Sequence, residues 1–532
     1  MLPVPMRALL CLPLLLTLAG GAAPRGPVAV FQQESVAKDP LTDLRELAET
    51  LSRADQPDPP EVLAAEFLFH DLRLLWTGQE GRRREIAAVV ADWIGVVESR
   101  QASGAGGELE LRTARRAIAW LGPRLGAGVA DALAREVATR STDSSAERRA
   151  GACRILAASD EGVARMALFA ASRDPERLVR DVALASLAGR DDQAVHTLLI
   201  EILTEAEAGK IEIRKGLVEE HFLAAQIGRS DAAFARVLVY VRRRLIAEDW
   251  RRASRAIAIG RCLENEVLLG PLVEALPVWM EYEEAGLPAK RIQGDLLTEL
   301  RRRTGRKLGL HPERWRLLLE AVRSGQLTID PGAADGSRPY SEASFFGLRP
   351  WTDRVVFVID RSGSMDQPYE RPPGGDFTGA ARSRHAEAIA QLISFLEALG
   401  PNTRFNVVLF SDEATSWRRK LVPATKDNLK SVAGWAVANG TGGSTRLRAG
   451  IHKAAALGRD GSLDLADLEA DTVIVLCDGE TDEGPDWVET FLHGVNDEAR
   501  LRFHSVQIGG SGDGSLHALC DGSGGDYSHV GD

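Results

Sequence analysis

The hydrophobic pattern of this chain changes its period once, and that change constrains the fold more than any other feature of the sequence. From Glu61 to Leu327, apolar residues recur at spacings of three and four among many alanines, leucines, glutamates and arginines, as amphipathic helices require. Beyond a stretch rich in Gly, Ser and Pro, the run Val355–Ile359 is continuously β-branched or aromatic, as a strand buried on both faces should be. The sequence therefore predicts two folded parts of different class.

The length of 532 residues also favours more than one hydrophobic core. Proline-rich and glycine-rich stretches mark the boundaries between the parts. We expect five segments: a signal peptide at 1–23, a linker at 24–60, a helical domain at 61–328, a second linker at 329–352 and an α/β domain at 353–532.

The first segment has the order of a secretory signal peptide. Arg7 precedes an apolar stretch from Ala8 to Ala19, and small residues follow it. This apolar stretch is shorter than the roughly 20 residues that a helix needs to cross a bilayer. We expect cleavage, a secreted or periplasmic protein, and no transmembrane segment in the mature chain. An uncleaved anchor or a buried N-terminal helix is the alternative.

The helical segment contains an internal repeat. An arginine–alanine–leucine pattern occurs twice at an interval of 31 residues: Arg149, Ala152, Leu156 and Arg180, Ala183, Leu187. Helix pairs that repeat at such intervals stack into solenoids, because one pair cannot bury its apolar faces alone. The segment resembles HEAT repeats over part of its length, and a non-repetitive helical domain is the alternative.

After residue 353, strands and helices alternate. The expected strands are Val355–Ile359, Phe405–Phe410, Thr472–Leu476, Leu501–Ile508 and Tyr527–Val530, with an edge strand at Ala414–Val422. The expected helices are His385–Leu399, Asp427–Val437, Arg446–Leu457, Asp486–Glu498 and Gly514–Leu519. This alternation predicts a doubly wound, mostly parallel, Rossmann-like sheet with helices on both faces.

Composition excludes several kinds of protein. The formal net charge is −11, and the arginine clusters of the helical segment lie among acidic residues without interleaved aromatics, so we expect no nucleic-acid partner. The five cysteines form no CxxC pair, which excludes a clustered zinc site and a disulfide-rich scaffold. We expect the cysteines of the mature chain to be small buried hydrophobic residues rather than two disulfide bridges.

The richest local chemistry follows the strand at Val355–Ile359. Asp360 comes at its carboxyl end, and the glycine-containing turn after it carries hydroxyls at Ser362 and Ser364. Oxygen-bearing side chains on one tight loop suit a hard divalent cation, and Arg361 is the only basic residue in this loop.

Two further segments carry oxygen ligands of the same kind. Asp478 follows the strand at Thr472–Leu476, and Thr445 ends a glycine-rich loop. Ligands of open α/β sheets bind beyond the carboxyl ends of the strands, where the strand order reverses. If the two strands are neighbours, five side chains converge there: Asp360, Ser362, Ser364, Thr445 and Asp478. They would hold Mg²⁺, or alternatively Mn²⁺ or Ca²⁺, and leave one coordination position for a carboxylate of another molecule.

The segment 353–532 resembles a von Willebrand factor A-type domain with a metal-ion-dependent adhesion site. The motif Asp-x-Ser-x-Ser begins at Asp360, the loop threonine of the family matches Thr445, and its Asp-Gly pair matches Asp478–Gly479. The closing segment Leu519–Tyr527 fits the last helix and strand of the family. The resemblance implies recognition of a protein partner whose exposed acidic residue is accepted by the bound cation.

Two features depart from the family pattern. Cys477 stands where Thr or Ser is common before the aspartate. The segment Asp366–Arg384, rich in Pro and Gly, is longer than the family usually needs, and it is either a source of partner specificity or a floppy insertion.

The residues also disfavour an enzyme. A phosphatase-like hydrolase would need a second acid two residues after Asp360, where the chain has Ser362, and no histidine lies in these motifs to act as a base. We therefore expect an exported protein-interaction module that is not an enzyme. The alternative is a structural or assembly scaffold in which the helical repeats bind and the metal only stabilises the sheet.

Overall fold

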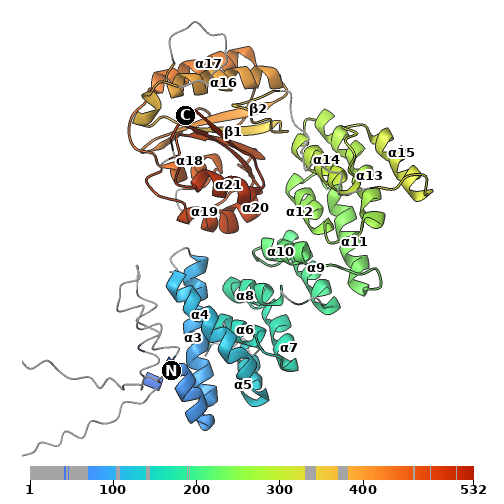
Figure 1. Ribbon diagram of the computed structural model, residues 1–532, viewed down its shortest axis with the longest axis vertical. Coiled ribbons are helices and arrows are strands. Elements are labelled where there is room, and N and C mark those ends of the chain that lie inside the picture. The colour runs from blue at the N-terminus through green and yellow to red at the C-terminus, as the bar shows by residue number, and fades with distance from the viewer. Residues whose placement is uncertain are drawn as a thin grey trace, which may run out of the picture.

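The computed structural model describes most of the chain. It covers residues 70–103, 108–138, 144–188, 190, 192–329, 343–369, 382–458, 462–479, 481–510 and 512–531, together with 41, 42 and 46. The predicted signal peptide at 1–23 and nearly all of the predicted linker at 24–60 lie outside the described residues. The helical part and the sheet-containing part are separate bodies that touch along one side (Figure 1).

The first part is helical throughout its described residues. After a helical stretch at 70–78, its elements are η1 (Glu80–Arg82), α3 (Arg83–Ala102), α4 (Glu108–Leu121), η2 (Gly122–Arg124), α5 (Ala127–Ala138), α6 (Ala146–Ala157), α7 (Gly162–Ala171), α8 (Arg177–Leu187), α9 (Gln193–Glu207), α10 (Gly216–Ala224), α11 (Ala232–Leu245), α12 (Trp250–Gly260), α13 (Asn265–Glu284), α14 (Lys290–Thr304) and α15 (Pro312–Arg323). The helical class expected from the sequence is confirmed.

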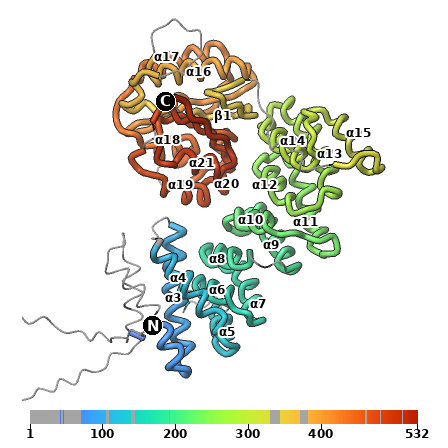
Figure 2. Tube along the Cα trace, in the orientation of Figure 1, coloured from blue at the N-terminus to red at the C-terminus, as the bar shows by residue number. Residues whose placement is uncertain are grey.

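The helices of this part pack in two layers. One layer runs α6, α8, α10, α12, α14, each in contact with the next. In the other layer α5 contacts α7, and α9 contacts α11, which contacts α13. The trace in Figure 2 follows this alternation from one layer to the other along the chain. Successive helix pairs therefore share one apolar core, and their identity as HEAT-like repeats stays a prediction.

The repeated arginines hold the turns between these helices. Arg149 of α6 donates two hydrogen bonds to the Asp174 carboxylate at 2.9 and 3.0 Å, and both side chains are almost fully buried. Arg180 of α8 donates to the carbonyls of Asp174, at 2.7 Å, and of Glu212 in the next turn, also at 2.7 Å. Both repeated arginines thus bond to a turn between helices, Arg149 through a carboxylate and Arg180 through backbone carbonyls.

The crossing of α3 and α6 requires glycine on both helices. A Cβ atom at Gly95 would lie 1.6 Å from the carbonyl oxygen of Glu147, and one at Gly151 would lie 1.8 Å from that of Ala91. No side chain fits at these two points, so the backbones of the two helices pack directly against each other.

The second part is an α/β sheet domain. Its strands are β1 (Arg354–Asp360), β2 (Arg404–Phe410), β3 (Ala414–Ser416), β4 (Val422–Pro423), β5 (Thr472–Cys477), β6 (Arg502–Ile508) and β7 (Tyr527–Val530). Its helical elements are η4 (Gly363–Asp366), α16 (Arg384–Leu399), α17 (Lys426–Asn439), α18 (Leu447–Ala454), α19 (Asp486–Phe491), η5 (Leu492–Asn496, a turn of π-helix), α20 (Asp497–Ala499) and α21 (Ser515–Ser523). The doubly wound fold class is confirmed.

The strand order is β3-β2-β1-β5-β6-β7, with β4 also paired to β2. Strands β2, β1, β5, β6 and β7 are parallel, whereas β3 and β4 run antiparallel to β2. The chain passes from β1 to one side of the sheet and returns through β5 on the other side. The strand order therefore reverses at β1, which is where an open sheet forms its binding crevice.

Each face of the sheet carries its own apolar core. Phe357 and Ile359 of β1 face α16 and α17, while Val356 and Val358 face α18, α19 and α21. This alternation follows from the period of two along a strand. It explains why the run is apolar at every position, as predicted.

One prediction for this part is wrong. The edge strand expected at Ala414–Val422 is two short strands, β3 and β4. The side chain of Asn406 in β2 accepts from the Arg418 amide at 3.1 Å and donates to the Arg418 carbonyl at 2.7 Å. These side-chain bonds replace the backbone ladder and interrupt the strand.

Arginines of α12 and α14 attach the helical part to the sheet domain. Arg291 of α14 is 4 % exposed and donates to the carbonyls of Asp471, at 2.6 Å, and Arg500. Arg255 and Arg251 of α12 donate to the carbonyls of Asp497, at 2.9 Å, and Ala499, at 3.2 Å. Because carbonyls at a helix end carry partial negative charge, these arginines cap α20 from outside its own domain.

Ion pairs also cross this interface, and three of them are short. Their N–O distances are 2.7 Å for Arg500–Glu219, 2.7 Å for Arg502–Asp295 and 2.6 Å for Lys215–Glu498. Arg502 opens β6 and Asp471 directly precedes β5, so the helical part lies at the amino ends of the strands. The carboxyl ends, where Asp360 and Asp478 stand, form the opposite edge of the sheet.

The four cysteines of the described residues form no disulfide bridge, as the sequence indicates. Cys153, Cys262, Cys477 and Cys520 are free thiols, buried or half-buried. Among the described residues, no helix is both long enough and apolar enough to cross a membrane.

Candidate metal centre

The two predicted aspartates lie at the ends of adjacent strands. β1 and β5 pair in parallel with Ile359 opposite Leu476, so the next residues, Asp360 and Cys477, are neighbours at the edge of the sheet. One ligand atom each from Asp360, Cys477 and Asp478 lie within 4.8 Å of one another. The condition on which the predicted convergence depended, adjacency of these strands, is therefore met.

The loop after β1 brings its hydroxyls together. Asp360 Oδ1 accepts a hydrogen bond from the Ser362 amide at 2.7 Å, which closes the turn. The Ser362 and Ser364 hydroxyl oxygens then lie 3.1 Å apart, and Ser364 is in the short helical turn η4. Two hydroxyls and a carboxylate of one loop thus occupy one small region.

The loop that carries Thr445 packs against the first loop through its backbone. The Gly442 amide donates to the Arg361 carbonyl at 2.7 Å, and the Gly363 amide donates to the Gly443 carbonyl at 3.2 Å. Among the described residues, the Thr445 hydroxyl makes no hydrogen bond. Thr445 is therefore on a loop tied to the site, and its role as a ligand stays a prediction.

Burial dominates the electrostatics of the two central side chains. The Asp360 side chain is fully buried, and burial raises its pKa to about 6, with the nearby Asp478 adding to the shift and the Ser362 amide opposing it. Burial likewise raises the pKa of Cys477 well above its usual value, so it remains a thiol. This thiol lies 3.2 Å from Asp360 Oδ2 and donates to it.

One charged residue beside the site, Arg384, could not be identified from the sequence. Arg384, the first residue of α16, has its Nη1 atom 3.9 Å from Asp478 Oδ2. The two residues are 94 positions apart in the chain, and no motif links them. Only the packing of α16 beside β5 and β6 reveals the contact.

The donor set fits a hard divalent cation. Two carboxylates, one of them fully buried, lie close together beside two hydroxyls, and all of these groups are oxygen ligands of the kind that Mg²⁺ prefers. A cation would relieve the repulsion between Asp360 and Asp478 and would favour the ionised form of both. The thiol of Cys477 is a poor ligand for Mg²⁺ and serves instead as a hydrogen-bond donor.

The segment that carries these residues also matches a known protein family. Residues 355–480 match the family described as "von Willebrand factor type A domain". The C-terminal part of the chain contains a von Willebrand factor A domain. The match covers β1 through β5, so it includes all of the predicted ligands.

Curated relatives share this region. The chain is 26 % identical over 254 residues to human inter-alpha-trypsin inhibitor heavy chain H4, which covers 46 % of this chain and 24 % of the relative. It is 32 % identical over 172 residues to the pig heavy chain H1, covering 31 % of this chain and 17 % of the relative. The chain therefore spans a quarter or less of the length of these relatives.

Solved structures also resemble the domain. A von Willebrand factor type A protein from Catenulispora acidiphila is 18 % identical, covers 35 % of this chain and 40 % of its own, and has a TM-score of 0.27. The conserved hypothetical protein BatB from Bacteroides thetaiotaomicron is 14 % identical, and its TM-score is 0.25. The match covers 34 % of this chain and 90 % of the BatB chain.

The insertion predicted beside the A-domain site is described only at its ends. Pro368 and Ser383 form an antiparallel bridge, and the Tyr369 amide donates to the Arg382 carbonyl at 2.8 Å. Residues 370–381 lie outside the described residues. The two ends of the insertion thus leave the A domain together, next to Arg384.

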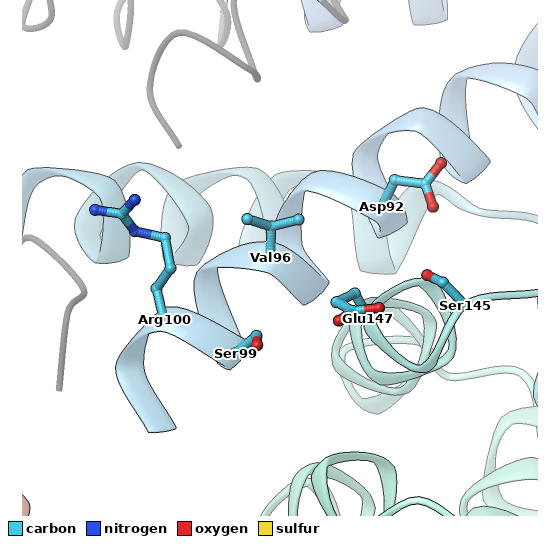
Figure 3. A pocket seen from close by; sticks show the side chains of 6 residues that line it. All are labelled: Asp92, Val96, Ser99, Arg100, Ser145 and Glu147. Atoms are coloured by element: carbon cyan, nitrogen blue, oxygen red, sulfur yellow. The ribbon is translucent and has the colours of Figure 1, made fainter. Parts of the chain in front are cut away.

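A hollow in the helical part is unrelated to this site. It measures about 230 Å³ and is lined by four residues of α3 and two at the start of α6 (Figure 3). Two of its three charged groups are already engaged, Asp92 by Arg148, and Arg100 by Glu110 at 3.3 Å. We assign no ligand to it.

Proposed function

We propose that this chain is an exported protein-interaction module that binds its partner through a divalent cation. Asp360, Ser362, Ser364, Thr445 and Asp478 hold the cation, with Mg²⁺ as the first candidate and Mn²⁺ or Ca²⁺ as alternatives. A carboxylate of the partner completes the coordination. The chain has no catalytic role in this proposal.

The observation that carries the proposal is the convergence of Asp360 and Asp478 at the point where the strand order reverses. Holding two carboxylates this close, one of them fully buried, is costly unless a positive charge neutralises them. The hydroxyls of Ser362 and Ser364 add neutral oxygen ligands, so they add no further negative charge that would oppose an incoming carboxylate.

Export is the second element of the proposal. It is supported by the order of charged, apolar and small residues at 1–23, which is typical of a cleaved signal peptide. A secreted or periplasmic location would expose the metal edge, meaning the carboxyl ends of β1 and β5 with Asp360 and Asp478, to partners outside the cytoplasm. The test of export is detection, outside the cytoplasm, of a processed protein whose N-terminus lies near residue 24.

The position of the helical part favours presentation of the metal edge. Among the described residues, the arginine contacts between the helical part and the sheet domain lie at the amino ends of the strands, opposite to Asp360 and Asp478. In the proposed function the helical part therefore holds the A domain with its metal edge facing outward.

The test uses the full chain in parallel captures with Mg²⁺, with a chelator, and with the variant Asp478→Asn. We expect a partner that is retained with Mg²⁺ and lost both with the chelator and in the variant. Asp467→Asn is the matched control, because Asp467 is exposed and away from the site. Equal retention of the partner in chelator and in Asp478→Asn would overturn the proposal and favour the scaffold alternative.

A further inference from the structure

Arg384 lies in a notch formed at the ends of β5 and β6. Its Nη1 atom is 3.9 Å from Asp478 Oδ2, just beyond β5, and its guanidinium lies against Gly509, just beyond β6. The Arg384 amide donates to the Gln367 carbonyl at 2.9 Å, and the hydroxyl of Ser383 caps the same helix. The start of α16 is therefore held in place on both sides of Arg384.

Gly509 makes room for the guanidinium. A Cβ atom at this position would lie 2.0 Å from Arg384 Nη2, which is far inside contact distance. The backbone of Gly509 also has φ of +72°, a conformation that favours glycine. The notch is thus shaped to hold the planar side chain of Arg384 beside Asp478.

The hydrogen-bonding capacity of Arg384 is unused in this arrangement. A distance of 3.9 Å to Asp478 is too long for a hydrogen bond, and the guanidinium donates none among the described residues. A guanidinium has five N–H donors in a planar fork that matches a carboxylate. The Arg384 side chain is 14 % exposed, so part of it is open to a molecule that approaches the site.

We propose that Arg384 is a positioning residue for the partner and selects a charged carboxylate over a neutral oxygen. This inference rests on the proposed metal-dependent function. One oxygen of the incoming carboxylate occupies the open position of the cation, and the other accepts from the Arg384 guanidinium. A neutral amide or hydroxyl of a partner could meet the cation but would gain less from the guanidinium.

The positive charge of Arg384 favours binding of the carboxylate but opposes binding of the metal ion. A guanidinium beside Asp478 repels a divalent cation, so it lowers the affinity of the empty site for the metal. It attracts an anion once the metal is bound. Removing the charge should therefore tighten metal binding and weaken carboxylate binding, two changes of opposite sign that a general loss of structure would not produce.

The experiment compares the full wild-type chain with Arg384→Gln. Mn²⁺ affinity is measured by calorimetry, and acetate is then titrated into the Mn²⁺-loaded protein while the relaxation of water protons by Mn²⁺ is followed. We expect Arg384→Gln to bind Mn²⁺ about three- to tenfold more tightly and acetate about three- to tenfold more weakly. The affinity for acetamide, a neutral molecule of similar shape, should stay unchanged.

Two further variants serve as controls. Arg384→Lys keeps the charge without the fork, so its Mn²⁺ affinity should match the wild type and its acetate affinity should be intermediate. Arg382→Gln removes an exposed arginine whose ion pair is with Glu387, at 3.8 Å, and should change neither affinity.

The outcomes separate this inference from the function on which it rests. If the wild type binds Mn²⁺ and acetate but both affinities are unchanged in Arg384→Gln, the role of Arg384 is wrong and the proposed function stands. If the wild type fails to bind Mn²⁺, the proposed function itself fails, and the inference falls with it.

Discussion

The thiol of Cys477 donates a hydrogen bond to Asp360 Oδ2 from the neighbouring strand, over 3.2 Å. Both side chains are fully buried, and Asp360 Oδ1 is already engaged by the Ser362 amide at 2.7 Å. Cys477 therefore orients the buried carboxylate through the oxygen that the loop does not reach. The residue that departs from the family pattern thus supplies a hydrogen-bond donor to the buried carboxylate.

Substitution of Cys477 tests this role. Cys477→Ser retains a donor of similar size, so we expect its Mn²⁺ affinity to stay within about threefold of the wild type. Cys477→Val removes this donor, so Asp360 Oδ2 is buried without the hydrogen bond from residue 477. We expect the free energy of Mn²⁺ binding to become less favourable by about 1 kcal/mol. Calorimetry on the full chain measures both. Equal affinities for Ser and Val variants would show that the thiol contact has no influence on the site.

The repeated arginines of the helical part should be strong determinants of stability. Arg149→Ala would leave the Asp174 carboxylate, 2 % exposed, without its two charged hydrogen bonds. We expect a loss of about 3–5 kcal/mol in the free energy of unfolding, measured by urea denaturation. The exposed pair Arg165–Asp192 offers the contrast, and Arg165→Ala should cost no more than about 1 kcal/mol.

A double substitution separates the loss of the ion pair from the cost of the unpaired charge. Arg149→Met together with Asp174→Leu removes both buried charges at once. Because most of the cost of the single variant comes from the uncompensated carboxylate, we expect the double variant to recover at least half of the lost stability. A double variant no more stable than Arg149→Ala would contradict this explanation.

The interface between the two parts depends on Arg291. Arg291→Leu removes the donor for the Asp471 and Arg500 carbonyls and also the guanidinium that lies 4.7 Å from the Trp250 ring. We expect a loss of about 2–4 kcal/mol in stability and faster hydrogen exchange around residues 497–502. Arg242→Leu, at an exposed position of α11, is the control and should leave both measurements unchanged. Unchanged exchange in Arg291→Leu would mean that the helical part does not hold this segment.

A buried acidic pair near the same interface makes stability depend on pH. Burial raises the pKa of Asp353 to about 7, and the neighbouring Asp471 adds to the shift. Between about pH 4 and pH 7 the folded protein keeps a proton on Asp353 that the unfolded chain has lost. The free energy of unfolding should therefore fall as the pH rises through this window and should level off above it.

The variant Asp353→Asn should remove most of this dependence. We expect it to be more stable than the wild type at pH 7.5 by about 1–3 kcal/mol, with a smaller difference at pH 5. Urea denaturation at several pH values measures the effect, and the exposed Asp467→Asn is the control. A wild type whose stability rises from pH 5 to pH 7.5, in parallel with Asp353→Asn, would show that Asp353 is ionised in the folded protein.

Local patterns in the sequence were sufficient for nearly all of the elements and for the three candidate ligands of the loop after β1. A strand buried on both faces must be apolar at every position, so Val355–Ile359 could be identified without knowledge of its neighbours. The loop from Asp360 to Ser364 follows this strand directly, so its oxygen ligands could be grouped by spacing alone. The helical class of the first part follows equally from the period of its apolar residues.

Other features depend on contacts between residues far apart in the chain, which leave no local pattern. The pairing of β1 with β5 brings Asp360 to Asp478, and the packing of α16 brings Arg384 to the same point. The division of the predicted edge strand depends on one side chain, Asn406, of the strand beside it. The attachment of the helical part to the amino ends of the strands depends on arginines that look, in the sequence, like ordinary solvated helix residues.

The sequence by itself thus determined nearly all of the helices and strands and which oxygen-bearing side chains stand at strand ends, because both follow from the spacing of neighbouring residues. Only the tertiary structure decided which strand ends meet, which arginine lies beside them and which edge of the sheet stays uncovered. Those outcomes depend on how side chains from distant segments pack together. Each such contact requires two complementary surfaces, and neither segment specifies it alone.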